Sequence, residues 1–207
     1  MGSEELREDV AGALRALSHA FVAHESDDRT LERVRDAAQA LVEEVDGQPP
    51  RDRMELFRRA MGEGEFKPSG AGFEDRAVAG RANPTALEFE TWREGDAMVC
   101  DVTLGPAFEG APGRAHGGIV AAVFDDFTGA IIGMLGEPAF TGEITVRFVA
   151  PVPVRTPLRL RTWLESRDGR KLHIHAEARA DDRVVATCRA VYITVDPSSF
   201  AAAPDPR

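Results

Sequence analysis

Two neighbouring carboxylates are the residues of this sequence with the clearest capacity for chemistry. Asp125 and Asp126 interrupt a run from Ile119 to Gly136 that is otherwise almost free of polar residues. An ionised carboxylate among apolar side chains costs several kcal/mol unless it is partnered. A carboxylate in such a place is therefore a candidate general base or nucleophile. The two lie about 100° apart around a helix, so both cannot face one pocket equally. We assign the chemistry to Asp125 and expect Asp126 at an interface or toward solvent.

A flexible approach with Gly110, Pro112 and Gly113 precedes the apolar run and leads into His116-Gly117-Gly118, which could supply a hydrogen-bond donor. Gly117 follows His116 at the start of the predicted helix. Without a side chain, its N–H can approach an anionic oxygen closely, and the helix terminus adds positive potential. The alternative is a glycine needed only for close packing of the helix on a sheet. Asp125 lies eight residues further, about 12 Å along the helix, so one chain cannot bring both groups to a single carbonyl.

Cationic residues gather at one predicted turn. Arg167, Arg170 and Lys171 lie within five positions, and Arg147 could join them from an adjacent strand. Such a cluster can hold phosphate groups, although a solvated hairpin has the same composition. His173 and His175 alternate onto one strand face and could chelate a metal, but no third ligand is apparent. We expect no metal.

The elements that must position these residues form an α+β pattern. The run at 119–136 predicts a buried helix; it is long enough to span a membrane, but its two Asp and flanking glycines favour a core helix. Period-2 alternation predicts antiparallel strands around it. These strands are at 85–91, 98–104, 140–150, 158–165, 172–179 and 184–195. An antiparallel sheet wrapped around one helix leaves the outer sheet face or the helix edge for another subunit to cover.

The N-terminal part has a different pattern. Apolar residues recur every three or four positions over 4–24 and 31–45, which predicts two helices, with a short third near 54–60. We therefore divide the chain into a helical extension and connection (1–80), a sheet-and-helix domain (81–196) and a flexible tail (197–207). The extension is expected to pack on the main domain.

Composition excludes several classes of function. The 207 residues carry a net charge of −10, and residues 1–80 contain 11 basic and 18 acidic side chains. Neither nucleic acid nor an anionic membrane is an expected partner. The acidic N-terminus lacks an apolar signal region, so we expect a cytoplasmic protein. Cys100 and Cys188 fall in strand-like runs; a disulfide is an alternative, but two buried free thiols are favoured.

These residues together resemble a known family. His116-Gly117-Gly118 with Asp125 nine residues after the histidine resembles the hotdog-fold acyl-CoA thioesterase superfamily. The stretch from Glu109 to Ala115, and Thr141 opening the strand that ends before Pro151, are similar to the branch containing human thioesterase superfamily members four and five. Gly169-Arg170-Lys171 also matches. The resemblance covers about residues 84–195 and leaves out the helical extension.

The resemblance implies a hotdog fold and hydrolysis of an acyl-CoA to a carboxylate and coenzyme A, with no other cofactor. Asp125 would act as base or nucleophile, and the Gly117 amide of a second chain would bind the oxyanion, so the protein would be a homodimer or a dimer of dimers. His116 would order the loop before the helix or, less in keeping with the pattern, act as acid–base. The further roles implied are positioning of water or Asp125 by Thr141, binding of coenzyme A by Arg147, Arg167, Arg170 and Lys171, and an acyl pocket lined by Phe124, Phe127 and Ile131.

Strict alternation creates a difficulty for Thr141. It places this residue on the polar face of its strand, so a bulge or an edge position is needed to aim it at Asp125. Two other functions remain open. A non-catalytic acyl-CoA sensor could use the helical extension as its output, although a sensor has no need of a buried acid. A hotdog dehydratase would use a paired His and Asp in a sequence context that is not found here.

Overall fold

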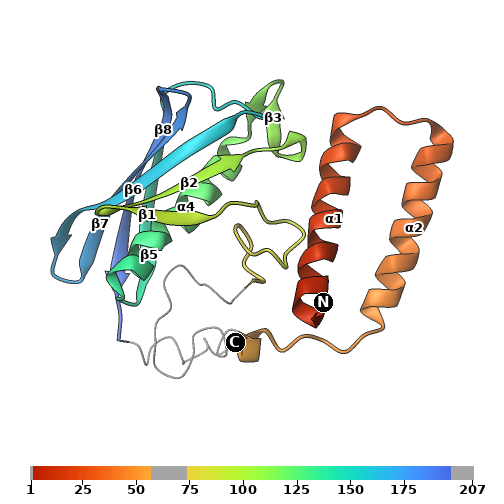
Figure 1. The fold of residues 1–207 in the computed structure, drawn as a ribbon, viewed down its shortest axis with the longest axis horizontal. Coiled ribbons are helices and arrows are strands. Elements are labelled where there is room, and N and C mark those ends of the chain that lie inside the picture. The colour runs from red at the N-terminus through yellow and green to blue at the C-terminus, as the bar shows by residue number, and fades with distance from the viewer. Residues whose placement is uncertain (1, 57–73, 197–207) are drawn as a thin grey trace.

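The computed structural model describes residues 2–56 and 74–196, in which a six-stranded antiparallel sheet curves around one long helix and a helical hairpin lies beside them (Figure 1). The predicted α+β hotdog architecture is confirmed. The predicted flexible tail (197–207) and part of the connection (57–73) lie outside the described residues. The elements are α1 (Ser3–Ala23), α2 (Asp28–Asp46), β1 (Thr91–Glu94), β2 (Ala97–Thr103), η2 (Pro106–Phe108), β3 (Glu109–Ala111), β4 (Arg114–Ala115), α4 (Gly117–Leu135), β5 (Ala139–Phe148), β6 (Pro157–Asp168), β7 (Lys171–Ala180) and β8 (Arg183–Thr194).

The sheet has the strand order β1-β2-β6-β7-β8-β5, so β5 is an edge strand paired only with β8. Alternate residues of β6, β7 and β8 point toward α4 and form the core with it. The largest buried side chains are Phe124, Phe127, Leu104, Ile131, Leu160, Leu172 and Ile174.

Two local predictions are wrong. The strand expected at 85–91 begins only at Thr91, and the residues before it are irregular. Here the Leu87 N–H donates to the carbonyl of Val78 instead of joining the sheet ladder. Glu109–Ala115, treated as a flexible approach, forms the small β3–β4 hairpin, turned by Gly113 at φ 75°. That positive φ is the conformation in which glycine is favoured.

Helix α4 buries only part of its surface. Nine of its residues, from Val120 to Gly133, are buried, while Asp125 and Gly118 are exposed. The predicted buried helix is thus covered on one face within the single chain, by the sheet. By length and composition α4 is the one candidate membrane span among the described residues, and half of that window is buried inside the protein, as in a core helix.

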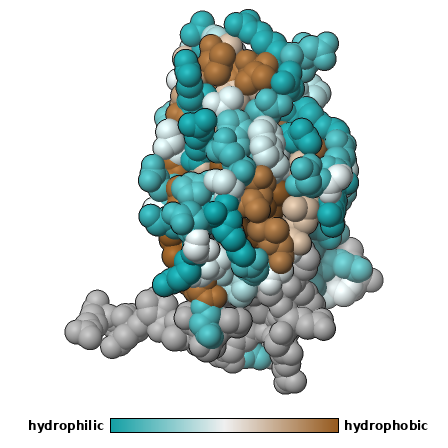
Figure 2. Space-filling view, turned by 90° about the vertical axis from the view of Figure 1, so that its left-hand side faces the viewer, coloured by the Kyte–Doolittle hydropathy of each residue, from teal (hydrophilic) through white to brown (hydrophobic). Residues whose placement is uncertain are grey.

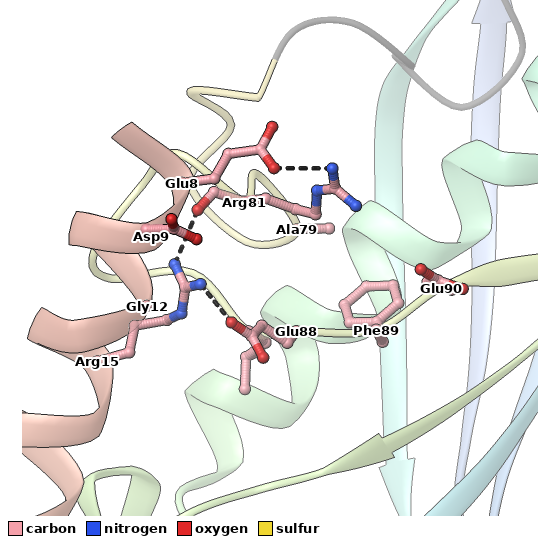
Figure 3. Close-up of a pocket in the computed structure, with 10 residues that line it drawn as sticks. Glu8, Asp9, Gly12, Arg15, Ala79, Arg81, Glu88, Phe89 and Glu90 are labelled. Carbon is pink, nitrogen blue, oxygen red and sulfur yellow. Dashed lines mark hydrogen bonds and ion pairs between the residues drawn. The ribbon is translucent and has the colours of Figure 1, made fainter. Parts of the chain in front are cut away.

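Helix α1 docks on the domain through polar side chains. Ala11, Arg15 and His19, four residues apart, face the domain. Arg15 donates to the carbonyl of Arg81 (3.1 Å) and pairs with Glu88 (Figure 3). It also donates to the carbonyl of Asn83 (2.8 Å). These contacts line one side of a cleft of about 660 Å³. Because every donor of a buried guanidinium needs an acceptor, this contact fixes the position of α1.

The apolar face of α1 lies away from this contact. The helix leaves Leu6, Val10, Leu14, Leu17, Phe21 and Val22 between 41% and 58% exposed. Helix α2 runs beside α1 (Figure 1) and has no buried residue. The short third helix predicted at 54–60 falls largely outside the described residues, although Arg53–Leu56 is helical.

Candidate active site

The carboxylate of Asp125 lies on the exposed face of α4, next to the edge strand β5. The Thr141 hydroxyl donates a hydrogen bond of 3.0 Å to Asp125 Oδ1. The ladder between β5 and β8 shifts register between Thr141 and Glu143, which is the irregularity that strict alternation requires. Because both side chains are exposed in the single chain, the oriented carboxylate is open to a ligand or to another subunit.

The backbone of Asp125 is also held. The Tyr192 hydroxyl donates to the Asp125 carbonyl (3.0 Å), and the Thr128 hydroxyl donates to the same carbonyl (3.2 Å). Burial raises the pKa of Tyr192, so its hydroxyl stays a proton donor at neutral pH. Sequence reasoning missed both residues. The available signals were that Tyr192 is the single tyrosine of the chain and that Thr128 lies one helical turn after Asp125.

His116 is the N-cap of α4. Its Nδ1 accepts from the Gly118 N–H (3.1 Å), and its own N–H donates to the carbonyl of Phe108 (2.8 Å). The imidazole therefore orders the helix N-terminus by hydrogen bonding; catalysis by His116 stays a prediction. Gly110 allows this arrangement, since a Cβ there would lie 2.8 Å from His116 Cα.

The amide of Gly117 is free to bind an anion. Among the described residues, none accepts a hydrogen bond from it. A Cβ at Gly117 would lie 3.3 Å from the ring of Phe148, which is half exposed on β5. Gly117 and Asp125 are both in α4, eight residues or about 12 Å apart along its axis. One chain thus presents an anion site and a carboxylate at two separate places.

Asp126 is largely covered within its own chain, so the predicted exposure to solvent is wrong, and a position at an interface stays a prediction. Its carboxylate pairs with Arg76 at 3.5 Å, and the two side chains are 19% and 26% exposed. Burial raises the pKa of Asp126, and the Arg76 charge opposes that rise. The segment before β1 therefore covers this side of α4, which leaves Asp125 as the accessible carboxylate of the two.

The predicted cation cluster is smaller than expected. Arg167 pairs with Glu137, and Arg170 Nε donates to the carbonyl of Thr194 (3.0 Å). Lys171 is exposed beside them. Arg147 does not join this cluster in the same chain, because its β8 partner is Thr187 whereas the partner of Lys171 is Ile193. Six residues of strand separate those positions by about 20 Å.

The residues of the predicted acyl pocket are not open to a ligand in the single chain, and their role in a pocket stays a prediction. Phe124, Phe127 and Ile131 have no exposed surface and belong to the core between α4 and the sheet. Their apolar character reflects core packing, which the sequence alone could not distinguish from a ligand pocket. The exposed large hydrophobic residues of β5 and its C-terminal end are Phe140, Phe148 and Val149.

The two cysteines and His175 also carry side chains that could take part in catalysis or bind a metal. Cys100 and Cys188 are buried free thiols, as predicted. Burial raises the pKa of both, to about 12 for Cys188, so neither is a thiolate at neutral pH. His175 packs its ring against Trp163 (4.7 Å between centroids). Within the described ranges no group of three His, Cys, Asp or Glu residues could hold a metal ion.

The sheet-and-helix domain is similar in sequence to known proteins. Residues 112–194 match the family model described as Thioesterase superfamily. The chain is 34% identical over 85 residues to acyl-coenzyme A thioesterase THEM4 of Xenopus laevis and, over the same length, to acyl-coenzyme A thioesterase THEM5 of Mus musculus. These alignments cover 41% of this chain but only 38% and 34% of those proteins.

One solved structure matches the fold of nearly the whole chain. The crystal structure of a thioesterase superfamily protein matches with a TM-score of 0.76 at 24% identity. The match covers 90% of this chain and 94% of that chain. Residues 112–194 of this chain are therefore similar to the Thioesterase superfamily in sequence, and the likeness beyond them is one of fold.

Proposed function

We propose that the chain hydrolyses an acyl-CoA thioester to a carboxylate and free coenzyme A. The observation that carries this proposal is the exposed Asp125 carboxylate, oriented by Thr141 on the central helix. The proposal is supported by the likeness to proteins named acyl-coenzyme A thioesterases. It also agrees with a helix N-terminus whose Gly117 amide is free to bind an oxyanion.

The reaction uses the two groups in sequence. The Asp125 carboxylate takes a proton from water while the water oxygen bonds to the thioester carbon, and the carbonyl electrons move onto oxygen. The Gly117 N–H stabilises that oxyanion. When the carbonyl re-forms, the carbon–sulfur bond breaks and the departing sulfur of coenzyme A takes up the proton. Direct attack by Asp125 would instead give an anhydride that water then hydrolyses.

The 12 Å between Gly117 and Asp125 makes this a two-chain site in our proposal. Gly117 of one protomer and Asp125 of its partner would face the same carbonyl. Strand β5 supports such an assembly, because an edge strand has unpaired backbone groups. Exposed Phe140, Phe148 and Val149 lie on this strand or directly after it. Figure 2 shows the side of the molecule away from α1 and α2, where hydrophobic patches interrupt the hydrophilic surface.

Coenzyme A carries phosphates that need cations. We assign them to Arg170 and Lys171 in the β6–β7 hairpin, with Arg167 available if it leaves Glu137. Substituting Lys171→Gln is expected to raise KM with little change in kcat, because phosphate binding precedes the chemical step.

Thiol release from acyl-CoAs of short, long and aromatic acyl groups tests the proposal. Asp125→Asn is expected to abolish turnover while the oligomer stays intact. Gly117→Pro removes the amide N–H at the first helical position, where proline is tolerated, and His116 already has the extended ψ of 131° that precedes proline. Gly117→Ala is the matched control, because it keeps the N–H and adds one carbon beside Phe148.

The expected order of kcat is wild type, then Gly117→Ala, then Gly117→Pro, with about a hundredfold or greater loss in the last. Full activity in Asp125→Asn would move the catalytic group elsewhere. Saturable acyl-CoA binding without any turnover would favour the sensor over the hydrolase.

A further inference from the structure

Helix α1 contacts the turn that leads into the candidate active site. His19 Nδ1 accepts a hydrogen bond from the N–H of Ala107 (3.1 Å). The His19 ring lies edge-on to Phe108, with 5.1 Å between centroids and 77° between planes. Gly105 makes this approach possible, since a Cβ there would lie 2.5 Å from the imidazole. The imidazole thus contacts η2 through Ala107 and Phe108.

That turn is in direct contact with the N-terminus of α4. The carbonyl of Phe108 accepts the N–H of His116 (2.8 Å), and His116 is the N-cap that precedes Gly117. Two hydrogen bonds, one at Ala107 and one at Phe108, therefore connect α1 to the residue before the free amide. The helical extension lies outside the matched family segment, which begins at residue 112.

We propose that His19 is a positioning residue, which holds the Gly117 amide in place through the η2 turn and the His116 backbone. The inference rests on the proposed role of Gly117 in binding the oxyanion. His19 itself does not touch the substrate. It fixes the backbone position of a donor whose effect on the reaction depends on distance and direction.

A histidine suits this position because the N–H of Ala107 in the turn is a donor that needs an acceptor. The neutral imidazole accepts at Nδ1 when its proton is on Nε2. Partial burial lowers the pKa of His19 and so favours the neutral form. The docking of α1 has an independent anchor in Arg15, with its contacts to Arg81, Asn83 and Glu88. Loss of the His19 hydrogen bond can therefore be separated from loss of the arm.

Two substitutions separate the hydrogen bond from the packing. His19→Asn keeps an acceptor near the Nδ1 position and removes the ring, whereas His19→Leu keeps apolar volume and removes the acceptor. Ser18→Ala is the matched control, because the Ser18 hydroxyl bonds only within α1, to the carbonyl of Leu14. The measurements are kcat and KM for an acyl-CoA that the wild type hydrolyses, and hydrogen exchange at the amides of Ala107 and His116.

We expect His19→Leu to lower kcat about three- to tenfold, the range for one neutral hydrogen bond, with KM changed less than twofold. Exchange at both amides should become faster. His19→Asn should restore most of kcat and of the protection, and Ser18→Ala should match the wild type. Unchanged kcat and exchange in His19→Leu would overturn the inference, as would a loss in His19→Asn equal to that in His19→Leu.

The exchange measurement keeps the inference separate from the proposed function. If the wild type hydrolyses no acyl-CoA, the proposed function fails. The rate of hydrogen exchange at the His116 amide then decides by itself whether His19 holds the loop. If the wild type is active but the His116 amide is equally protected in all variants, the inference fails while the hydrolase stands.

Discussion

The Thr141 hydroxyl donates to the Asp125 carboxylate across 3.0 Å, and so connects an edge strand to the central helix. The contact exists because β5 is irregular at Thr141–Glu143. A bulge re-aims a side chain by adding one residue to one strand of a pair. The carboxylate is thereby oriented from outside its own helix, and rotation of its χ angles is restricted before any substrate arrives.

Replacement of Thr141 should therefore affect turnover more than folding. Thr141→Val keeps the shape of the side chain and removes the donor, and a hydrogen bond to a charged group contributes about 1.5–3 kcal/mol. We expect kcat to fall by roughly ten- to a hundredfold, with the midpoint of urea unfolding little changed. Thr141→Ser restores the hydroxyl and should recover most of the activity. Equal kcat in Thr141→Val and the wild type would show that Asp125 needs no such orientation.

The Tyr192 hydroxyl holds the same residue by its backbone. Tyr192→Phe leaves the Asp125 carbonyl with the Thr128 hydroxyl as its side-chain donor, beside the helix's own backbone bond. We expect the free energy of unfolding to fall by about 1 kcal/mol and kcat to fall severalfold, because the helical turn that carries the carboxylate loosens. Thermal unfolding and thiol release measure the two effects. A stability loss without any change in kcat would make Tyr192 a core residue only.

The ion pair between Arg76 and Asp126 gives a pH-dependent prediction. Burial raises the pKa of Asp126 above its ordinary value of 3.8 and Arg76 opposes this, so Arg76→Met should raise it further. A carboxyl with a higher pKa in the folded state stabilises the fold at acid pH and loses this contribution as pH rises through the folded pKa. We expect Arg76→Met to lower the free energy of unfolding by about 1–3 kcal/mol at pH 7 and by less at pH 4.5.

Urea unfolding at the two pH values measures this difference. Arg81→Met is the control, because its ion pair with Glu8 is more exposed, at 58% and 24% of the two side chains. Removal of such a pair costs about 0–1 kcal/mol. An equal loss at both pH values in Arg76→Met would mean that packing of the arginine stem, and not the charge on Asp126, accounts for its effect.

Periodicity predicts most of this fold, and spacing predicts the parts of the site that lie on one element. Helix α4 and strands β5 to β8 follow from apolar patterns. The order of His116, Gly117 and Asp125 in the sequence predicts where they lie along α4, whereas their roles come from the resemblance and stay predictions. The bulge that aims Thr141, the Tyr192 hydroxyl and the His19 contact all depend on tertiary approach, which local patterns do not encode. Phe124 and Asp126 are placed differently from expectation for the same reason. The apolar run does not show that Phe124 packs against the sheet or that Asp126 pairs with Arg76.

The 12 Å between Gly117 and Asp125 along α4 gives a test of the two-chain site that needs no structure of the complex. Consider a heterodimer of one Asp125→Asn chain and one Gly117→Pro chain. The Asp125→Asn chain keeps the Gly117 amide, and the Gly117→Pro chain keeps the Asp125 carboxylate. One of the two sites is then complete. Each variant alone has no complete site, so mixing them should restore about half of the wild-type activity in heterodimers, and about a quarter in a statistical mixture with half heterodimers.

Two differently tagged chains, co-expressed and purified through both tags, provide the heterodimer. The control joins Asp125→Asn to Gly117→Pro in one chain and pairs it with wild type. If the site is shared, both sites of this control pair are defective. One site lacks the Asp125 carboxylate and the other lacks the Gly117 amide, because the doubly substituted chain contributes one group to each site. If instead the site lies within one chain, the intact wild-type subunit keeps half of the activity and the complementing pair has none. The two pairs therefore give opposite results for the two arrangements, and an inactive complementing pair beside a half-active control would reject the shared site.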